Sequence, residues 1–505
     1  MPEVSNSEFV QAHTSDDYRR AQAVRERVRD VTAGAAVVKS LGGNLADSYK
    51  YLIPTERQKS NADEYQRYLA MAVWPGYTGA TDLTAGGLLA VGEPTWKIPP
   101  NHRELQQLIE YATPFKDGIK ALQLRINRRQ RIDGQCVLLM EVNSDERIRN
   151  GDPMFFINSY KSEKFLTAWF DFEDGESIAR FVILDESDYE FDWIKKKRNY
   201  VNKYRLLGID ERDRYYQMAF RADQWNSINV RNPRPADDPA NPQFGEAFYP
   251  APNGRVFNRI PLTWCNVTNL SGTSYENPML ADLADLDLSI FNADAAYRQT
   301  LWLTSQPINV IIGGNGDKIL LAYGAGAVHH LPEGYKEEWL EFTGAGAGAQ
   351  RTALEDLHAR AIAKSMSLFG NVGSNQSGEA LKIIQGSQVA PLVSMVQTSG
   401  DAITEQLRYA ARWLGMSREQ AAEEVLYSPS ENFARLNLSI TEIMNVINGM
   451  ANNADLVPLL EKEVRRAFVE SGLAEDMSWD EFLKAWQEEK EERQTSRMLD
   501  SAELG

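Results

Sequence analysis

Cysteine and histidine are scarce in this chain of 505 residues, which contains two cysteines and five histidines. Cys136 and Cys265 cannot form a disulfide framework, and neither stands in a metal or redox motif. His329 and His330 are adjacent, but neighbours on a strand point to opposite faces, and no H-E-x-x-H or C-x-x-C motif supports them. The sequence therefore predicts no metal site and no cofactor, and it fits a reducing, cytoplasmic setting.

Long apolar runs are also missing, and so is an excess of positive charge. No window reaches the ~18 apolar residues that a membrane span needs, and the N-terminus lacks a basic stretch followed by an apolar one, so we expect neither secretion nor a membrane span. Asp and Glu number 71 against 54 Lys and Arg, which gives a net charge of −17. This balance argues against tight wrapping of nucleic acid, although it allows nucleic acid to pass without being held.

Motifs of common enzymes are absent as well. The glycine-rich segment 313–318 ends in a lysine, but its spacing is wrong for a phosphate-binding loop, and Ile319 follows where Ser or Thr is needed. A hairpin turn is the favoured interpretation. The glycines at 344, 346 and 348 have no lysine beside them and indicate a hinge, and there is no G-x-S-x-G elbow. We therefore do not expect an enzyme.

The composition, with 43% apolar and 10% aromatic residues, allows two to four structural units. The most informative stretch is 277–313, which predicts a long helix running into a strand. Pro278 suits a first helical turn and Pro307 ends the helix, so that it would be roughly 40 Å long. Its apolar stripe has steps of three and four residues: Met279, Leu283, Leu286, Ile290, Ala293, Tyr297 and Leu301.

The charge of this helix is one-sided. It contains no Lys or Arg before Arg298, but it has five carboxylates: Glu276, Asp282, Asp285, Asp287 and Asp294. Like charges on one helix destabilise it slightly unless something offsets them. We therefore expect this face to meet something other than bulk water, and an ordinary amphipathic helix packed on a domain core stays the alternative.

The segments that follow extend this pattern. Two β-like pieces lie within 306–347, and a helix resumes over Gln350–Phe369, which together predict an antiparallel stalk with a small β cap. The stretch 370–380 is small and polar, as in a loop. Helical spacing returns over Ala380–Leu414, where Pro391 must kink or break the helix.

Upstream, the chain predicts a mixed α+β unit. A polar N-terminal region contains a basic surface helix with Arg19, Arg20, Arg25, Arg27 and Arg29. Helical spacing over Arg103–Ile126 ends in Arg125, Arg128, Arg129 and Arg131, and the buried strand CVLLMEV and several short β runs follow. The basic run 195–198 beside Trp193 could touch nucleic acid, but a solvated hairpin tip is favoured.

The order of these features resembles the portal (head-to-tail connector) proteins of tailed double-stranded DNA bacteriophages. The family signature P-L-x-D-L-A-D-L-N stands here as PMLADLADLD at 278–287, with methionine and aspartate in place of the usual leucine and asparagine. Further matching pieces are EYQRYLAMAVWPGYT, GQCVLLMEV, RFVILDES, NRIPLTW, and SGEALKII after SLFG. The resemblance covers about residues 60–440, and the tail beyond it has no counterpart that we can align.

The resemblance implies an α+β portal-type fold that assembles into a ring, expected to be a dodecamer. The implied regions are an N-terminal region and mixed α/β wing (1–275), a descending stem helix (276–305), a clip (306–347), a returning stem helix (348–369), a tunnel loop (370–378), a kinked wing helix and strand (379–440) and a helical crown and tail (441–505). It further implies a virion protein at the portal vertex, present in the host cytoplasm during assembly. Its implied partners are double-stranded DNA, the major capsid protein, terminase and head-to-tail adaptors.

The same resemblance implies roles for particular residues. Asn371, Ser374, Asn375 and Gln376 would touch DNA from the tunnel loop. Asp282, Asp285, Asp287 and Asp294 would be candidates for lining the channel, where a negative wall repels phosphates. Pro391 would mark the helix kink. Asn309, Asn315, Asp317 and Lys318 would dock partners at the clip. The apolar stripe becomes a predicted contact between subunits.

Two alternatives stay open at this stage. One is a metal-dependent nuclease of the packaging machinery, with Asp282, Asp285 and Asp287 as a two-metal carboxylate site. The other is an adaptor ring that is not a portal. Cleavage of plasmid DNA with Mg²⁺ or Mn²⁺ would indicate the nuclease, whereas packaging that survives deletion of 370–378 would indicate the adaptor.

Overall fold

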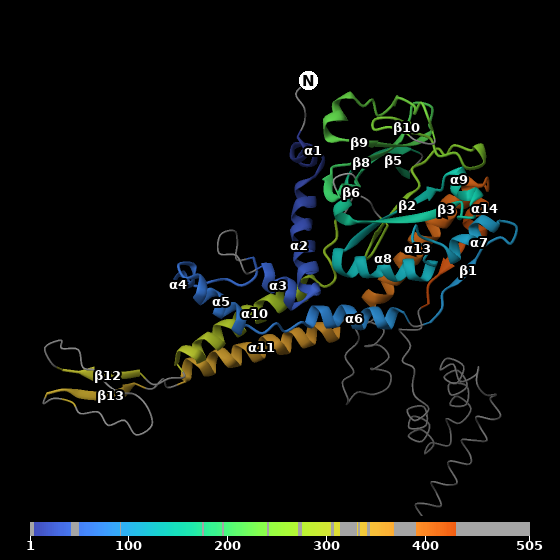
Figure 1. The fold of residues 1–505 in the computed structure, drawn as a ribbon. Coiled ribbons are helices and arrows are strands. Elements are labelled where there is room, and N and C mark those ends of the chain that lie inside the picture. The colour runs from blue at the N-terminus through green and yellow to red at the C-terminus, as the bar shows by residue number, and fades with distance from the viewer. Residues whose placement is uncertain are drawn as a thin grey trace, which may run out of the picture. The chain divides into compact units, whose positions relative to one another are not determined.

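The computed structural model describes residues 5–41, 50–90, 92–173, 176–193, 196–239, 242–270, 275–304, 308–313, 331, 334–340, 344–367 and 390–430. The chain divides into two units, Met1–Glu431 and Asn432–Gly505, and the described residues all belong to the first. This first unit mixes helices with antiparallel sheets, consistent with the α+β class (Figure 1).

The α-helices of the described part are α1 (Asn6–His13), α2 (Asp16–Ala33), α3 (Ala35–Leu41), α4 (Glu56–Lys59), α5 (Ala62–Met71), α6 (Tyr77–Leu89), α7 (Arg103–Glu110), α8 (Ile119–Asp133), α9 (Asp145–Arg149), α10 (Ala281–Thr304), α11 (Ala345–Ser367), α13 (Ala390–Trp413) and α14 (Arg418–Glu424). The strands are β1 (Thr95–Lys97), β2 (Gln135–Val142), β3 (Phe155–Lys161), β4 (Phe165–Glu173), β5 (Glu176–Asp185), β6 (Asp188–Asp192), β7 (Lys197–Val201), β8 (Tyr204–Ile209), β9 (Tyr215–Phe220), β10 (Ala247–Phe248), β11 (Leu262–Asn266), β12 (Ile308–Ile312), β13 (Lys336–Leu340) and β14 (Leu426–Ser428).

A three-stranded sheet of order β11-β2-β3 lies at the main core, and a five-stranded sheet of order β10-β9-β8-β5-β4 lies beside it. The predicted strand CVLLMEV is β2, and its residues are buried except Val142, which is partly buried, as expected for a run without polar alternation. Helices α8 and α13 contact β2 and β11. Cys136 and Cys265 are opposite one another in the β2–β11 register, and both thiols are free and buried.

Gly134 ends α8 and sets the close approach of the chain that leads into α10. Its φ is +73°, and an added Cβ would lie 2.5 Å from the Glu276 carbonyl oxygen. Alanine there would meet both a left-handed backbone conformation and a backbone clash. We predict that Gly134→Ala lowers the free energy of unfolding by about 2 kcal/mol, measured by urea unfolding.

Gly151 provides the matched control for this substitution. Its φ is +94°, but nothing lies within 4 Å of an added Cβ. Gly151→Ala should therefore cost only the backbone strain, about 1 kcal/mol. Equal losses for the two variants would contradict the role given to the contact between Gly134 and Glu276.

Two predictions for the N-terminal half need correction. The helix expected over Arg103–Ile126 is two helices, because α7 ends at Glu110 and α8 begins at Ile119. Pro114 and Gly118 lie in the intervening turn, and Lys116 has a φ of +62°. The predicted basic surface helix is α2, but its inner face is core and Arg25 on that face is fully buried.

Of the basic run 195–198, Lys196 lies in the turn before β7, and Lys197 and Arg198 begin β7, as a hairpin end predicts. Strands β6 and β7 pair antiparallel, and Lys196 and Lys197 are exposed. Trp193 is exposed too, and its ring lies 4.8 Å from that of Phe191, centroid to centroid. Lys195 itself is outside the described residues.

Candidate functional site

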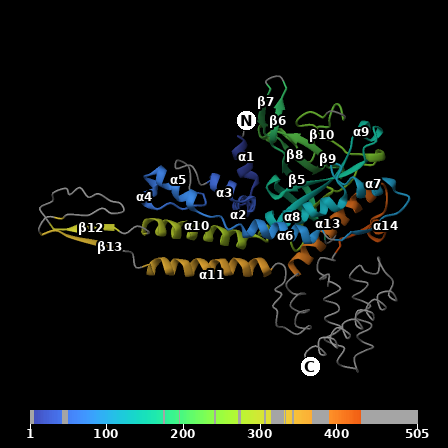
Figure 2. The same ribbon diagram turned by 60° about the horizontal axis from the view of Figure 1, so that its bottom comes forward.

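Helices α10 and α11 form an antiparallel hairpin, side by side in both ribbon views (Figures 1 and 2). Lys364, late in α11, lies 2.6 Å from Asp282, early in α10. Strands β12 and β13 lie between the two helices in the chain and pair antiparallel, with Ile308 opposite Leu340. The helix, strand pair and returning helix predicted from the sequence are thus present, although α10 begins at Ala281 rather than Pro278 and α11 begins at Ala345, inside the expected glycine hinge.

The apolar stripe of α10 packs within its own chain. Leu283 and Ile290 are buried in a cluster with Val28 and Val31 of α2 and with Leu354 and Ala361 of α11. The prediction that this stripe forms a subunit contact is therefore wrong for its buried residues. For this face the alternative, an amphipathic helix packed on a core, is correct.

Asp287, predicted to line a channel, is fully buried. Its carboxylate accepts hydrogen bonds from the backbone N–H of Tyr77 at 3.1 Å and of Thr78 at 2.7 Å. These amides begin α6, whose N-cap residue is Gly76 and has no side chain to cap them. Burial raises the pKa of Asp287, and the hydrogen bonds from Thr78 and Tyr77 oppose that rise. The carboxylate of Asp287 in α10 therefore caps the N-terminus of α6. The prediction that Asp287 lines a channel is wrong, because its side chain is buried.

Asp294 is the second buried residue among the four acids that were predicted to line the channel. It is buried, accepts a hydrogen bond from the Val73 N–H at 2.9 Å and pairs with Arg298 at 2.7 Å. Trp74 packs on Phe291 of α10 with a ring-centroid distance of 5.4 Å. Asp294 and Asp287 therefore fasten the segment before α6 to α10.

Asp282 and Asp285 are exposed, with 74% and 54% of their side chains accessible. Each has a cation from another element, because Asp282 pairs with Lys364 and Asp285 pairs with Arg27 at 2.8 Å. The part of α10 before Arg298 has no cation of its own, and its exposed acids are thus paired with cations from α11 and α2. Of the four predicted acids, these two keep the exposure that lining a channel requires.

Apolar side chains are exposed at the far end of the hairpin. We call Leu301, Trp302 and Leu303, in the last turns of α10, and Ile312 of β12 the distal apolar residues; their exposed fractions are 40%, 58%, 50% and 50%. From the sequence, Leu301 belongs to the apolar stripe that was predicted to contact another subunit, whereas Trp302, Leu303 and Ile312 were given no role. The run Leu-Trp-Leu breaks the spacing of three and four, and that break was the available signal.

Two of the remaining predicted site residues, Asn309 and Pro391, are described by the structure. Asn309 is in β12, opposite Trp339 of β13. Pro391 is in the first described turn of α13, and the segment upstream that would form the other arm of a kink is outside the described residues. Also outside the described residues are Asn315, Asp317, Lys318, His329, His330, Asn371, Ser374, Asn375, Gln376 and the chain after 430.

The described residues contain no group of three or more His, Cys, Asp or Glu side chains placed to hold a metal ion. Asp282 and Asp285 are exposed, whereas Asp287 is buried against the start of α6. The three carboxylates proposed for a nuclease therefore do not form one open cluster. No helix in the described part of the chain has both the length and the apolar content to cross a bilayer.

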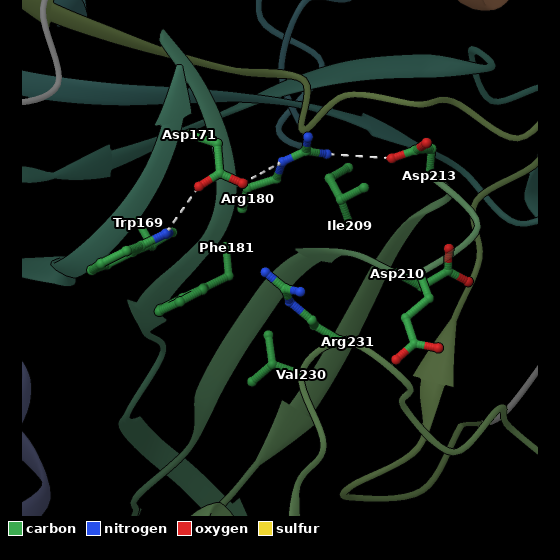
Figure 3. Close-up of a pocket in the computed structure, with 10 residues that line it drawn as sticks. Trp169, Asp171, Arg180, Phe181, Ile209, Asp210, Asp213, Val230 and Arg231 are labelled. Atoms are coloured by element: carbon green, nitrogen blue, oxygen red, sulfur yellow. Dashed lines mark hydrogen bonds and ion pairs between the residues drawn. The ribbon is translucent and has the colours of Figure 1, made fainter. Parts of the chain in front are cut away.

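A cavity of about 420 Å³ lies on the five-stranded sheet, lined in part by Trp169, Phe181 and Arg231 (Figure 3). Arg180 bridges Asp171 at 3.0 Å and Asp213 at 3.3 Å. Burial alone would raise the pKa of the neighbouring Asp210, but hydrogen bonds from the Arg214 side chain and from backbone amides lower it overall. These three carboxylates are engaged with arginines of the same chain, so we assign the cavity no chemistry.

Comparison with known proteins gives one family match. Residues 278–414 match the family described as a domain of unknown function, DUF4055. This range runs from just before α10 to just after α13 and so contains the whole hairpin. No curated protein matches the chain.

Solved structures with a partly similar backbone include parts of gene transfer agent (GTA) particles. The neck of a native GTA particle computed with C12 symmetry aligns with a TM-score of 0.36 and 10% identity, over 75% of this chain and 86% of the other. The neck of an empty GTA particle computed with C6 symmetry and the virion of a native gene transfer agent particle each give 0.37 and 11%, over 76% and 89%. At such scores the likeness establishes neither a common fold nor a common function.

Proposed function

We propose that this chain is the subunit of a portal, a ring that forms the DNA channel at one vertex of a phage-like capsid. The order of elements supports it: a long helix, a β hairpin, a returning helix, the polar stretch 370–378 and a further long helix. The motifs that resemble portal proteins follow the same order. In this proposal the chain is a structural virion protein without catalytic activity or cofactor, and packaging energy comes from a separate terminase.

The observation that carries the proposal is the helical hairpin with its two distinct regions. One region of α10 is fastened to its own chain by α2, α5 and α6, through buried apolar contacts and the carboxylates of Asp287 and Asp294. The other region ends in the distal apolar residues, which a single chain leaves in water. Repetition of the hairpin around a ring covers such residues with a neighbouring copy, which removes apolar area from water.

The exposed acids fit the same arrangement. Repeated around a ring, Asp282 and Asp285 contribute negative charge to a wall, and negative charge repels DNA phosphates so that the duplex slides. The polar residues of the tunnel loop, Asn371, Ser374, Asn375 and Gln376, make weak and replaceable phosphate contacts.

The clip completes the proposal. We assign to it the paired strands β12 and β13 and the connection between them, where Asn309, Asn315, Asp317 and Lys318 dock terminase and then the adaptors. The wing contacts the major capsid protein. Twelve copies form the ring.

Deletion of 370–378 tests the portal against the adaptor ring. We expect the shortened chain to assemble into rings but to package DNA poorly, because the loop touches DNA and does not hold the subunits together. Packaged DNA is measured as nuclease-protected DNA in particles assembled with the variant. A Gly/Ser segment of the same length in place of 370–378 controls for chain shortening. Normal packaging by both variants would contradict a portal and support an adaptor ring.

A further inference from the structure

Two arginine-rich stretches that are far apart in the sequence meet in one pocket. The pocket has a volume of about 320 Å³ and lies between α2 and α8, with one residue from β3. It is lined by Arg29, Thr32, Ala33, Arg125, Arg128, Arg129, Ile132, Asp133 and Lys161. Five of these side chains are cationic and one is acidic, in a chain whose net charge is −17. The basic runs noted in the sequence thus converge on a local excess of positive charge.

Four of the five cations have carboxylate partners, and three of these four are arginines. Arg29 pairs with Glu163 and lies 3.4 Å from Asp133. Arg128 pairs with Asp82 at 3.1 Å, and Arg125 pairs with Asp117. These pairs hold the arginines in place around the pocket.

Arg129 differs from these three, because no ion pair to it is found among the described residues. Its guanidinium is partly buried, and its Nη1 atom is shielded from solvent without a hydrogen-bond partner. Lys161 lies 3.8 Å from Glu163, at the limit of an ion pair. Because the Arg129 guanidinium lines the pocket and has no ion-pair partner in the described part of the chain, its charge favours an acceptor from outside the chain.

Positive charge also lies behind the pocket. Arg25 is one helical turn before Arg29, it is fully buried, and none of its three guanidinium nitrogens has a hydrogen-bond partner within the described part of the chain. Asp133 is the acid with the largest electrostatic effect on Arg25, and burial raises the pKa of the Asp133 carboxyl, which disfavours its charged form. The carboxylates present therefore compensate this group of arginines only in part.

We propose that this pocket binds a phosphate group, with Arg129 and Lys161 as its direct ligands. Several guanidinium forks around one site suit a tetrahedral oxyanion with many acceptor oxygens better than a single carboxylate. The volume is at the lower end of the range for small-ligand pockets, which leaves room for a phosphate and part of an attached sugar. The phosphate comes either from a free phosphate or nucleotide, or from a nucleic-acid backbone.

The experiment uses the full chain and two phosphate probes. Inorganic phosphate is titrated against the thermal midpoint at constant ionic strength, with chloride as the balancing anion. A fluorescein-labelled DNA duplex is titrated by anisotropy in the same buffer. We expect phosphate to raise the midpoint by at least about 2 °C at saturation, since a ligand that binds only the folded state stabilises it.

Arg129→Gln tests the assignment, and Arg20→Gln is the matched control. Arg20 is on α2, near the end of that helix that is away from the pocket. It pairs with Asp17 at 3.5 Å, and 78% of its side chain is exposed. Loss of a charged hydrogen bond should weaken phosphate binding by about tenfold or more in Arg129→Gln, and binding by Arg20→Gln should be unchanged. The midpoint without phosphate shows that both variants are folded.

The outcomes separate the sources of the phosphate. Arg129-dependent binding of inorganic phosphate alone indicates a free ligand, and Arg129-dependent binding of the duplex, with or without phosphate, indicates a backbone. A midpoint shift that chloride reproduces, or one that Arg129→Gln retains, would overturn the proposal. So would Arg129-dependent binding of poly-glutamate without binding of phosphate or duplex, because the site would then serve an acidic protein segment. Ring assembly is measured separately, so failure here leaves the portal proposal untouched.

Discussion

Asp287→Ala is expected to lower the free energy of unfolding by about 3 kcal/mol. The substitution leaves two backbone donors at the start of α6 without an acceptor: the buried N–H of Thr78 and the partly buried N–H of Tyr77. Each orphaned donor costs about 1–3 kcal/mol, and relief of the buried negative charge offsets part of that loss. Urea unfolding at a fixed protein concentration, followed by tryptophan fluorescence, measures the change.

Two further variants isolate this role. Asp285→Ala removes an exposed acid of the same helix, whose ion pair with Arg27 is worth at most about 1 kcal/mol. Asp287→Asn keeps one acceptor oxygen and should fall between the wild type and Asp287→Ala. A loss in Asp287→Ala no larger than that in Asp285→Ala would show that the carboxylate does not hold α6.

The double variant Leu301→Glu, Leu303→Glu is expected to abolish ring assembly and leave a folded monomer. The two side chains are 40% and 50% exposed in the single chain, so we expect the charged replacements to leave the fold intact. In a ring each leucine, already about half-buried in the single chain, would gain roughly 1 kcal/mol from further burial, whereas a buried, unpaired glutamate is strongly unfavourable. The loss is repeated at every contact around the ring. Mass photometry and the circular dichroism spectrum measure assembly and folding.

Phe115→Glu is the control for adding a charge at an exposed apolar position. Phe115 lies in the turn between α7 and α8, away from the hairpin, and 80% of it is exposed. Its variant should assemble like the wild type. Rings formed by the double variant as readily as by the wild type would mean that the distal apolar residues do not lie between subunits.

The elements of the hairpin were predictable because their signals are local. The spacing of apolar residues along α10 and α11 indicates a helix that buries one face, and four of the five residues of β12 are β-branched. The same spacing does not say what covers the buried face. Val28 and Val31 cover it from a helix about 250 residues earlier in the chain. The spacing of apolar residues in α10 does not show which helix packs on it.

The roles of the acids were not predictable for a related reason. Asp282, Asp285 and Asp287 look alike in the sequence, but Asp287 meets amides that are 209 and 210 residues away. The break between α7 and α8 could have been foreseen from Pro114 and Gly118. The convergence of Arg29 with Arg125, Arg128 and Arg129 could not, because only the packing of α2 on α8 brings the two basic runs together.

Negative-stain electron microscopy of the purified full-length chain tests the central claim most directly. The portal proposal predicts rings with a central hole and end-on views with regular rotational symmetry. A homogeneous monomer at high protein concentration, with no rings in any field, would contradict it.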